Sequence, residues 1–207
     1  MTEKTCHLVG AGDFFGLYEE IRADDIVIAV DGGYKVLTDM GIMPHFVVGD
    51  FDSLGTVPAG ENVTVLPSEK DVTDMFTAIN KGIENGFFDF AVYGGTGGRL
   101  DHTIANIQLL KYFSEKGVKI RLYGDGFTVT AVSDGKITLN GKKGSYISVF
   151  SLSEECSVSL IGLKYELQSH TLDNAFPLGV SNEFTDRPAE ISVEGGTLAV
   201  YYTIGKD

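Results

Sequence analysis

The sequence has few of the features that mark secreted, membrane or zinc-binding proteins. It contains two cysteines, Cys6 and Cys156, which lie far apart and show no CxxC spacing, so no disulfide framework is expected. No apolar run approaches the roughly 20 residues that span a bilayer, and the first residues lack the basic and apolar regions of a signal peptide. We therefore expect a cytoplasmic protein with reduced thiols and no membrane partner.

Basic side chains are also scarce. The chain has 16 Lys and Arg against 29 Asp and Glu, a formal net charge of −13. No basic stripe is present to neutralise a phosphate backbone, so nucleic-acid binding is not expected. An acidic balance suits cations instead, either metal ions or a positively charged small molecule.

What is present in residues 1–124 is an alternation of short apolar runs with segments of helical spacing. The runs predict strands at Cys6–Val9, Ile26–Val30, Phe46–Val48, Val63–Leu66, Phe90–Tyr93 and Ile120–Tyr123. The segments between them predict helices at Phe14–Ile21, Tyr34–Met40, Thr73–Glu84 and Thr103–Lys116. This alternation indicates an α/β layer with a mainly parallel sheet, whose ligands gather at the carboxyl ends of the strands.

Residues 125–207 follow a different pattern, with short alternating strands and glycine-containing turns. Strands are expected at Lys136–Leu139, Tyr146–Phe150 and Val158–Leu160, and as a hairpin of Glu190–Val193 with Thr197–Tyr202 across Glu194-Gly195-Gly196. We therefore predict an α/β fold in two domains, an α/β domain at 1–124 and an all-β sandwich or barrel at 125–207.

Aspartates follow several predicted strands or open the next helix: Asp31, Asp50, Asp52, Asp71, Asp74 and Asp101. If the sheet is parallel, these segments lie at one edge and their carboxylates converge. Gathering like charges is costly unless a cation neutralises them, and hard oxygen ligands suit Mg²⁺. The pattern predicts a magnesium site, although each aspartate taken singly also fits a helix cap or a turn.

A glycine-rich segment, Gly94–Gly98, precedes the last predicted helix of this domain. Glycines let the backbone approach an anion, and a helix amino terminus favours negative charge. It is not a Walker A loop, because it lacks the lysine of that motif. Arg99 adds a bidentate phosphate partner, and Lys70 is a second candidate cation.

One rival remains open on these residues alone. Asp50-Phe51-Asp52-Ser53 also resembles the DxD segment of phosphatases that attack phosphorus with the first aspartate. The four histidines show no metal-ligand spacing, and no GxSxG segment announces a serine nucleophile.

Taken together, the segments resemble the thiamine pyrophosphokinase family, in its bacterial form. The resemblance rests on Asp31-Gly32-Gly33, Gly49-Asp50-Phe51-Asp52-Ser53, Lys70-Asp71-Val72-Thr73-Asp74, Gly94-Gly95-Thr96-Gly97-Gly98-Arg99-Leu100-Asp101-His102, Gly162-Leu163-Lys164-Tyr165 and Gly179-Val180-Ser181-Asn182-Glu183. It implies a nucleotide-binding catalytic domain at 1–124, a thiamine-binding and dimerisation domain at 125–207, and a homodimer with active sites between subunits. The family reaction converts ATP and thiamine to AMP and thiamine diphosphate.

The resemblance also implies roles for residues. Asp31, Asp50, Asp52, Asp74 and Asp101 are expected to organise Mg²⁺ and the reacting groups, and Asp50, Asp52, Asp74 and Asp101 are the catalytic candidates. The ATP-binding candidates are Asp31, Gly32, Lys70, Thr73, Gly94, Gly95, Thr96, Gly97, Arg99 and His102. Ser181 and Asn182 are expected to contact thiamine. Since the chain has no tryptophan, Tyr165 is the candidate aromatic partner of thiamine.

Two further rivals remain. A diphosphokinase for another hydroxymethyl heterocycle, such as a pterin, would share the aspartate framework. A nucleotide or thiamine sensor would keep the fold without turnover, although binding alone does not require so many carboxylates.

Overall fold

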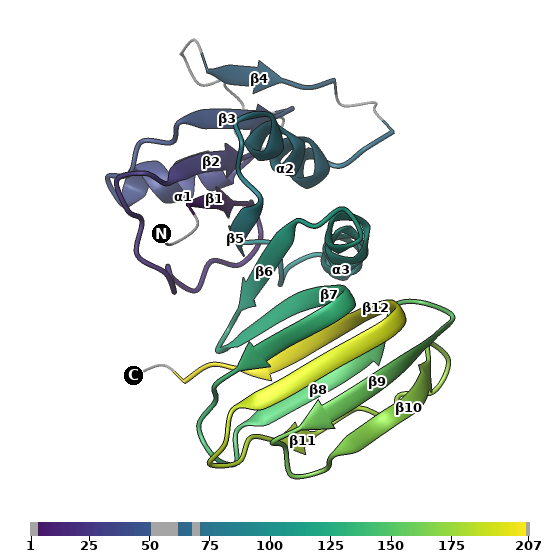
Figure 1. The fold of residues 1–207 in the computed structure, drawn as a ribbon. Coiled ribbons are helices and arrows are strands. Elements are labelled where there is room, and N and C mark those ends of the chain that lie inside the picture. Colours follow the sequence, from purple (N-terminus) through teal and green to yellow (C-terminus); the bar gives the residue numbers. More distant parts are fainter. Residues whose placement is uncertain (1–3, 51–61, 68–70, 206–207) are drawn as a thin grey trace. The chain divides into compact units, whose positions relative to one another are not determined.

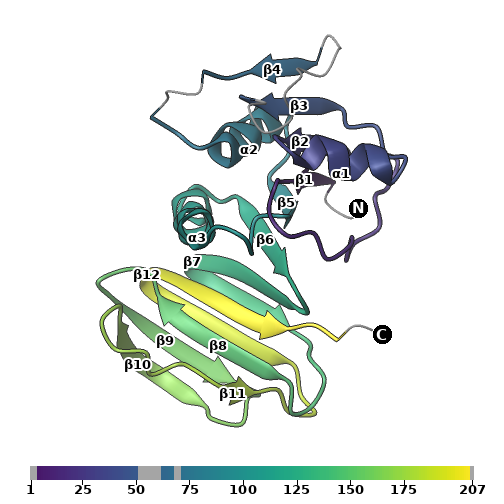
Figure 2. The same cartoon turned by 180° about the vertical axis from the view of Figure 1, so that it is seen from behind.

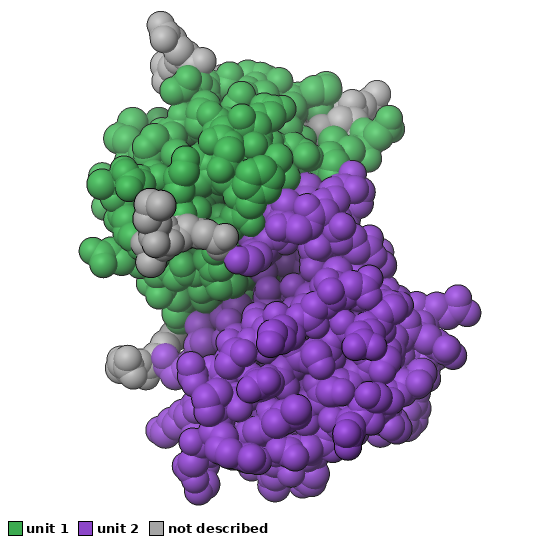
Figure 3. Space-filling model, viewed as in Figure 1, with its two compact units in different colours: residues 1–106, 121–124 green, residues 107–120, 125–207 purple. Residues whose placement is uncertain are grey.

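The computed structural model describes residues 4–50, 62–67 and 71–205. The chain forms two compact units, residues 1–106 with 121–124 and residues 107–120 with 125–207 (Figure 3). The predicted division after residue 124 stays a prediction, because the helix at Leu100–Ser114 contributes to both units. None of the described helices combines the length and apolar character needed to cross a membrane.

The first unit is built on a parallel sheet (Figure 1). Its strands are β1 (Thr5–Val9), β2 (Ile26–Val30), β3 (Phe46–Gly49), β4 (Val63–Val65), β5 (Asp89–Tyr93) and β6 (Lys119–Gly124), in the order β6-β5-β1-β2-β3-β4. The pairs β1 with β2, β1 with β5, β2 with β3 and β3 with β4 are parallel. The six predicted strands are therefore confirmed, each to within one residue at either end.

Helices α1 (Gly33–Asp39) and α2 (Asp74–Glu84) lie on opposite faces of strands β1 to β3, as the two views of Figures 1 and 2 show. A right-handed crossover explains this, because α1 leads outward from β2 to β3 whereas α2 leads back from β4 to β5. Gly82 of α2 packs so closely that an added methyl group would lie 2.5 Å from the Phe90 ring. Helix α3 (Leu100–Ser114) follows β5, and all three of these predicted helices are confirmed.

The fourth predicted helix, Phe14–Ile21, is wrong, since this segment is irregular. Hydrogen bonds to residues of neighbouring strands, and not the backbone hydrogen bonds of a helix, hold this segment in place. The Glu19 carboxylate accepts hydrogen bonds from Arg121 Nε at 2.6 Å and from the Tyr123 hydroxyl at 2.5 Å, and the Glu19 N–H donates to the Tyr93 hydroxyl. Gly16, with φ at 100°, interrupts the segment. Tertiary contacts thus override local helical spacing.

The second unit is antiparallel and contains β7 (Phe127–Leu139), β8 (Tyr146–Ser151), β9 (Glu155–Ile161), β10 (Leu167–Asp173), β11 (Asn182–Glu183) and β12 (Ala189–Thr203). Strand β12 pairs with β7 along its length, with β9 through its first half and with β8 through its second half. Because one strand serves two sets of partners, the strands enclose an apolar core that includes Ile147, Leu160 and Ile191. The predicted β-sandwich is confirmed.

The predicted hairpin across Glu194-Gly195-Gly196 is wrong, because both halves belong to the continuous strand β12. Ile191 pairs with Ile137 and Ala199 pairs with Ala131, so β7 spans the glycines, and the register shifts between Val193 and Thr197. Gly195 adopts a φ of 75° at this bulge. Strand β10 escaped prediction because it is mostly exposed and shows no apolar alternation.

Candidate active site

A cavity of about 390 Å³ lies where the strands of the first unit end. It is lined by segments that follow β1, β2 and β5 and by the amino-terminal turns of α2 and α3. The lining residues are Gly10, Ala11, Gly12, Asp13, Val30, Asp31, Thr73, Asp74, Met75, Gly94, Gly95, Gly97, Gly98, Arg99, His102, Ala105 and Asn106. The cavity thus occupies the carboxyl edge of a parallel sheet, where ligands of such folds bind.

Two glycine segments lie backbone to backbone in the cavity wall. Gly10 N–H donates to Tyr93 O and Gly12 N–H donates to Gly94 O, both at 2.8 Å. A methyl group on Gly10 or Gly12 would lie 2.7 Å from the Gly94 carbonyl oxygen. Only glycine permits this approach, which extends the β1 and β5 pairing past the ends of both strands. We call residues 10–12 and 94–97 the paired glycine segments.

Asp31 follows β2, and its side chain contacts the residues that end β3. Its φ is 48°, in the left-handed region that aspartate tolerates better than most residues. The Asp50 N–H donates to Asp31 Oδ1 at 3.2 Å, and a methyl group on Gly49 would lie 2.0 Å from that same oxygen. The absence of a side chain at Gly49 therefore makes the space in which the Asp31 carboxylate sits.

Two other acidic side chains, Asp74 and Asp50, lie close enough to Asp31 to affect its protonation. Burial, together with the nearby charges of Asp74 and Asp50, raises the pKa of the Asp31 carboxyl to about 6, while the Asp50 N–H opposes the shift. A proton or a cation relieves this repulsion. Among the described residues, however, no group of three or more acidic, histidine or cysteine side chains already forms a metal-binding arrangement.

The cavity also carries cationic and polar groups from two helix starts. The Thr73 hydroxyl accepts the Phe76 N–H at 3.2 Å and caps α2. Arg99 precedes α3 and is exposed, and its Nε and Nη2 donate to the Asp101 carboxylate at 3.1 and 2.5 Å. This pairing lowers the pKa of Asp101 to about 2. His102 also faces the cavity.

The structure brings eight of the predicted site residues to this cavity: Asp31, Thr73, Asp74, Gly94, Gly95, Gly97, Arg99 and His102. Gly32, Asp50, Thr96 and Asp101 do not line it. Thr96 is buried and its hydroxyl donates to Tyr123 O at 3.4 Å, whereas Asp50 contacts Asp31 through its backbone. Asp52 and Lys70 lie outside the described residues. The roles of all these residues stay predictions.

Sequence reasoning missed Gly10–Asp13 and Asn106. The first segment had a usable signal, since two glycines and an acid follow the buried strand β1 just as acids and glycines follow β2 and β5. Asn106 had none, because its role is tertiary: from the second turn of α3, its Nδ2 donates to Gly95 O at 2.7 Å.

Ser181 and Asn182 lie in the second unit and form a tight local structure. Asn182 is buried, its Oδ1 accepts the N–H groups of Tyr165 and Glu183, and its Nδ2 donates to Tyr165 O at 2.7 Å. Ser181 has a φ of 60° and its N–H donates to the Ser148 hydroxyl at 3.0 Å. The amide of Asn182 thereby fixes the backbone of Tyr165, whose ring is exposed.

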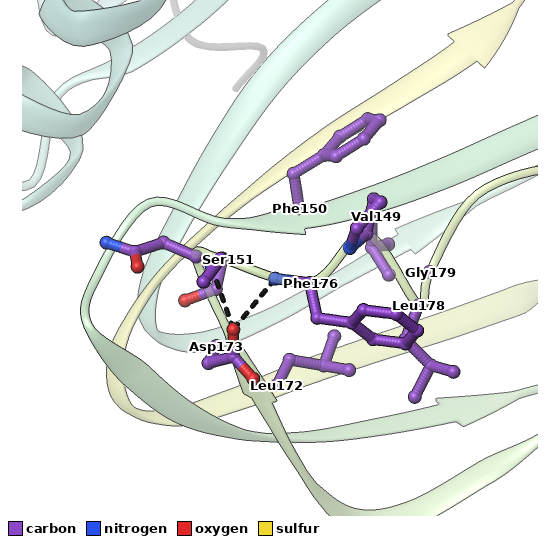
Figure 4. Close-up of a pocket in the computed structure, with 11 residues that line it drawn as sticks. Val149, Phe150, Ser151, Leu172, Asp173, Phe176, Leu178 and Gly179 are labelled. Carbon is purple, nitrogen blue, oxygen red and sulfur yellow. Dashed lines mark hydrogen bonds between the residues drawn. The ribbon is translucent and has the colours of Figure 1, made fainter.

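A second hollow of about 290 Å³ lies just before this segment (Figure 4). Its walls are mostly apolar and include the exposed side chains of Phe150, Phe176 and Leu178. The loop is shaped by Asp173, whose Oδ1 accepts the N–H groups of Ala175 and Phe176, each at 2.8 Å. The hollow therefore presents apolar side chains to solvent beside Ser181.

Two family models match the chain. "Thiamin pyrophosphokinase, catalytic domain" matches residues 17–122, and "Thiamin pyrophosphokinase, vitamin B1 binding domain" matches residues 135–198. The thiamine pyrophosphokinase of Bacillus subtilis is 31% identical over 94% of this chain and 96% of its own length. Thiamin pyrophosphokinase 1 of Caenorhabditis elegans is 30% identical over 73% of this chain and 72% of its own length.

Solved structures of thiamine pyrophosphokinases are also similar to this chain. The crystal structure of the Bacillus subtilis thiamine pyrophosphokinase superposes with a TM-score of 0.86 at 29% identity, covering 97% of this chain and 99% of that one. The thiamin pyrophosphokinase of Geobacillus thermodenitrificans gives a TM-score of 0.83 at 27% identity, with 98% and 99% coverage.

Proposed function

Because this chain belongs to the thiamin pyrophosphokinase family, we propose that it transfers the diphosphoryl group of ATP to the hydroxyl group of thiamine, forming thiamine diphosphate and AMP. The observation that carries the ATP part of this proposal is the cavity itself. It combines crowded carboxylates at Asp31 and Asp74 with the paired glycine segments and the Arg99 guanidinium. A polyphosphate and its cation need these two kinds of surface side by side.

We assign Mg²⁺ as the cation. The fit rests on the donor set: Asp31 and Asp74 offer hard oxygen ligands, and the negative charges of Asp74 and Asp50 beside the partly buried Asp31 favour a positively charged neighbour. Asp31, Asp74 and Asp50 would hold the ion, together with Asp52 and Asp101 as the sequence predicts. When bound, Mg²⁺ supplies charge neutralisation for the phosphates and for the transition state.

The backbone N–H groups of the glycine-rich segment Gly94–Gly98 and of the first turn of α3 can donate hydrogen bonds to the phosphate oxygens. Arg99 offers a planar pair of donors once it exchanges its present partner Asp101 for phosphate. Thr73, at the start of α2, lines the same cavity. These groups position the β-phosphorus for in-line attack, which is the main requirement of phosphoryl transfer.

The attacking hydroxyl must lose a proton. Asp50, Asp52 and Asp74 are the candidates for the group that accepts it, and the acceptor must be a carboxylate not fully occupied by the cation.

For the thiamine-binding surface, we propose Ser181, Asn182 and Tyr165. Asn182 holds Tyr165 with its aromatic ring exposed, which leaves a flat surface available for the pyrimidine of thiamine. We further propose a homodimer in which the second unit of one subunit completes the catalytic cavity of its partner. The exposed Phe150, Phe176 and Leu178 next to Ser181 support an apolar contact there. The two buried, free cysteines agree with a cytoplasmic setting.

The decisive assay measures AMP and thiamine diphosphate from Mg-ATP and thiamine, with 6-hydroxymethyl pterin as the competing acceptor. We expect equimolar AMP and thiamine diphosphate, and no reaction with the pterin. AMP formed only with the pterin would refute thiamine as substrate, and nucleotide binding without turnover would indicate a sensor. Release of inorganic phosphate with a phospho-aspartate adduct in the mass spectrum would indicate a phosphatase.

A further inference from the structure

Asp13 lines the cavity of the first unit, and the proposed diphosphoryl transfer gives it no role. It directly follows the first of the paired glycine segments, and its N–H donates to Thr96 O at 3.1 Å. A methyl group on Gly97 would lie 2.2 Å from Asp13 Oδ2. The Asp13 carboxylate therefore lies directly against Gly97, and the residue is exposed, so a ligand can reach it.

This position is separate from the crowded acids. Asp31 contacts the end of β3 through the Asp50 N–H, whereas Asp13 contacts the loop that follows β5. In the sheet order β5-β1-β2-β3, these two places lie on opposite sides of β1. The cation proposed for Asp31 and Asp74 therefore leaves the Asp13 carboxylate to another part of the ligand.

A carboxylate at this place repels phosphate and is suited to a neutral group that donates hydrogen bonds. An ionised carboxyl group has two acceptor oxygens side by side, which match two adjacent hydroxyl groups. The ribose of a nucleotide presents such a pair in its 2′- and 3′-hydroxyl groups. Carboxylates bind ribose hydroxyls in other α/β nucleotide sites for the same chemical reason.

We propose that Asp13 binds the ribose diol of the nucleotide and makes the enzyme selective for ribonucleotides, an inference that rests on the proposed ATP-dependent function. The triphosphate then runs from the paired glycine segments toward Asp31 and Asp74. This orientation places the departing AMP at the Asp13 end of the cavity.

The test compares the wild type, Asp13→Ala and the control Asp24→Ala with ATP and with 2′,3′-dideoxy-ATP. Asp24 is exposed and does not line the cavity. In the wild type we expect kcat/KM for the dideoxy nucleotide to be about 10-fold lower or more, the scale of a charge-assisted hydrogen bond. With ATP, the kcat/KM of Asp13→Ala should be lower than that of the wild type by a similar factor. With dideoxy-ATP, the kcat/KM of Asp13→Ala should equal the wild-type value for that nucleotide. Its KM for thiamine should not change, and Asp24→Ala should match the wild type.

An equal loss on both nucleotides in Asp13→Ala would overturn the proposal, because the residue would then not sense the diol. So would a variant that keeps its preference for ATP over dideoxy-ATP while losing its preference for ATP over inosine triphosphate, since that result assigns Asp13 to the base. Calorimetric binding of the two nucleotides gives the same comparison without turnover. If the wild type forms no thiamine diphosphate, the proposed function fails while the binding comparison still decides the role of Asp13.

Discussion

The Asp50 N–H donates a 3.2 Å hydrogen bond to Oδ1 of Asp31, and this contact ties the ends of β2 and β3 together. Two segments nineteen positions apart thereby place their acids at one edge of the sheet. The carboxylate that accepts this bond is also the one whose pKa is raised to about 6 by burial and by its acidic neighbours. The same residue is thus central to local structure and to the proposed chemistry.

Asp31→Asn should abolish diphosphoryl transfer and yet stabilise the metal-free protein at neutral pH. Asparagine keeps an oxygen for the Asp50 N–H and tolerates the positive φ. The folded-state pKa of Asp31 lies above its unfolded value, so its contribution to stability is full below pH 3.8 and is lost as pH rises through about 6. Allowing for partial exposure of the group, the gain at pH 7.5 should be on the order of 1 kcal/mol.

Calorimetry at pH 4 and pH 7.5 checks this. The variant should melt a few degrees above the wild type at pH 7.5, with the difference shrinking at pH 4. Asp24→Asn, an exposed control, should shift neither curve. A destabilised Asp31→Asn at pH 7.5, or one that retains full activity, would contradict the assignment of Asp31 to the cation.

Gly49→Ala should lower activity by about 10-fold or more, because the new methyl group would lie 2.0 Å from Asp31 Oδ1 and force that carboxylate to move. The matched control is Gly135→Ala, where the nearest atom, the Ser133 carbonyl oxygen, is 3.4 Å from the added carbon. Urea denaturation should show destabilisation only for Gly49→Ala.

A thermodynamic cycle sharpens this second prediction. In an Asp31→Gly background the clashing side chain is gone, so the further cost of Gly49→Ala in unfolding free energy should largely disappear. If the cost is unchanged in that background, the methyl group strains atoms other than the Asp31 carboxylate, such as the Asp31 Cα at 3.1 Å.

Glu19→Gln should destabilise the protein by about 1–3 kcal/mol, because Arg121 and Tyr123 both bond this partly buried carboxylate. The neighbouring Glu20 is exposed, so Glu20→Gln should stay within about 0.5 kcal/mol of the wild type. Chemical denaturation measures both. Comparable effects for the two variants would mean that the charged contacts of Glu19 do not hold the segment Phe14–Ile21 in its irregular path.

The proposed sharing of active sites between subunits predicts complementation. Asp31→Asn and Tyr165→Ala should each have little activity at low thiamine concentration, one lacking its cation ligand and the other its aromatic surface. Coexpressed with different tags, they should regain about a quarter of wild-type activity, since half of the dimers are mixed and each mixed dimer has one intact site of two. Mixed dimers without regained activity would place the whole site within one chain.

The sequence by itself determined most of the strands and helices of the first unit and several residues of its cavity. Apolar runs bounded by acids and glycines are local signals, and they located all six strands of the parallel sheet together with Asp31, Asp74 and the loop at Gly94. Their meeting follows from one rule, that parallel strands end at the same edge. The segment Ser181-Asn182 was likewise recognisable from its pattern.

Only the tertiary structure decided which residues serve that site and how the rest of the chain runs. The irregular path of Phe14–Ile21 depends on Arg121 and Tyr123, about a hundred residues away, and those contacts outweigh a helical spacing that was visible locally. The glycines at 10 and 12 matter because Gly94 packs against their backbone, a closeness that no local pattern encodes. No local pattern encodes the role of Asn182 either, because its side chain hydrogen-bonds the backbone of Tyr165, seventeen positions earlier. Periodicity reports which face of an element is buried, whereas these features depend on which distant atoms occupy the space beside it.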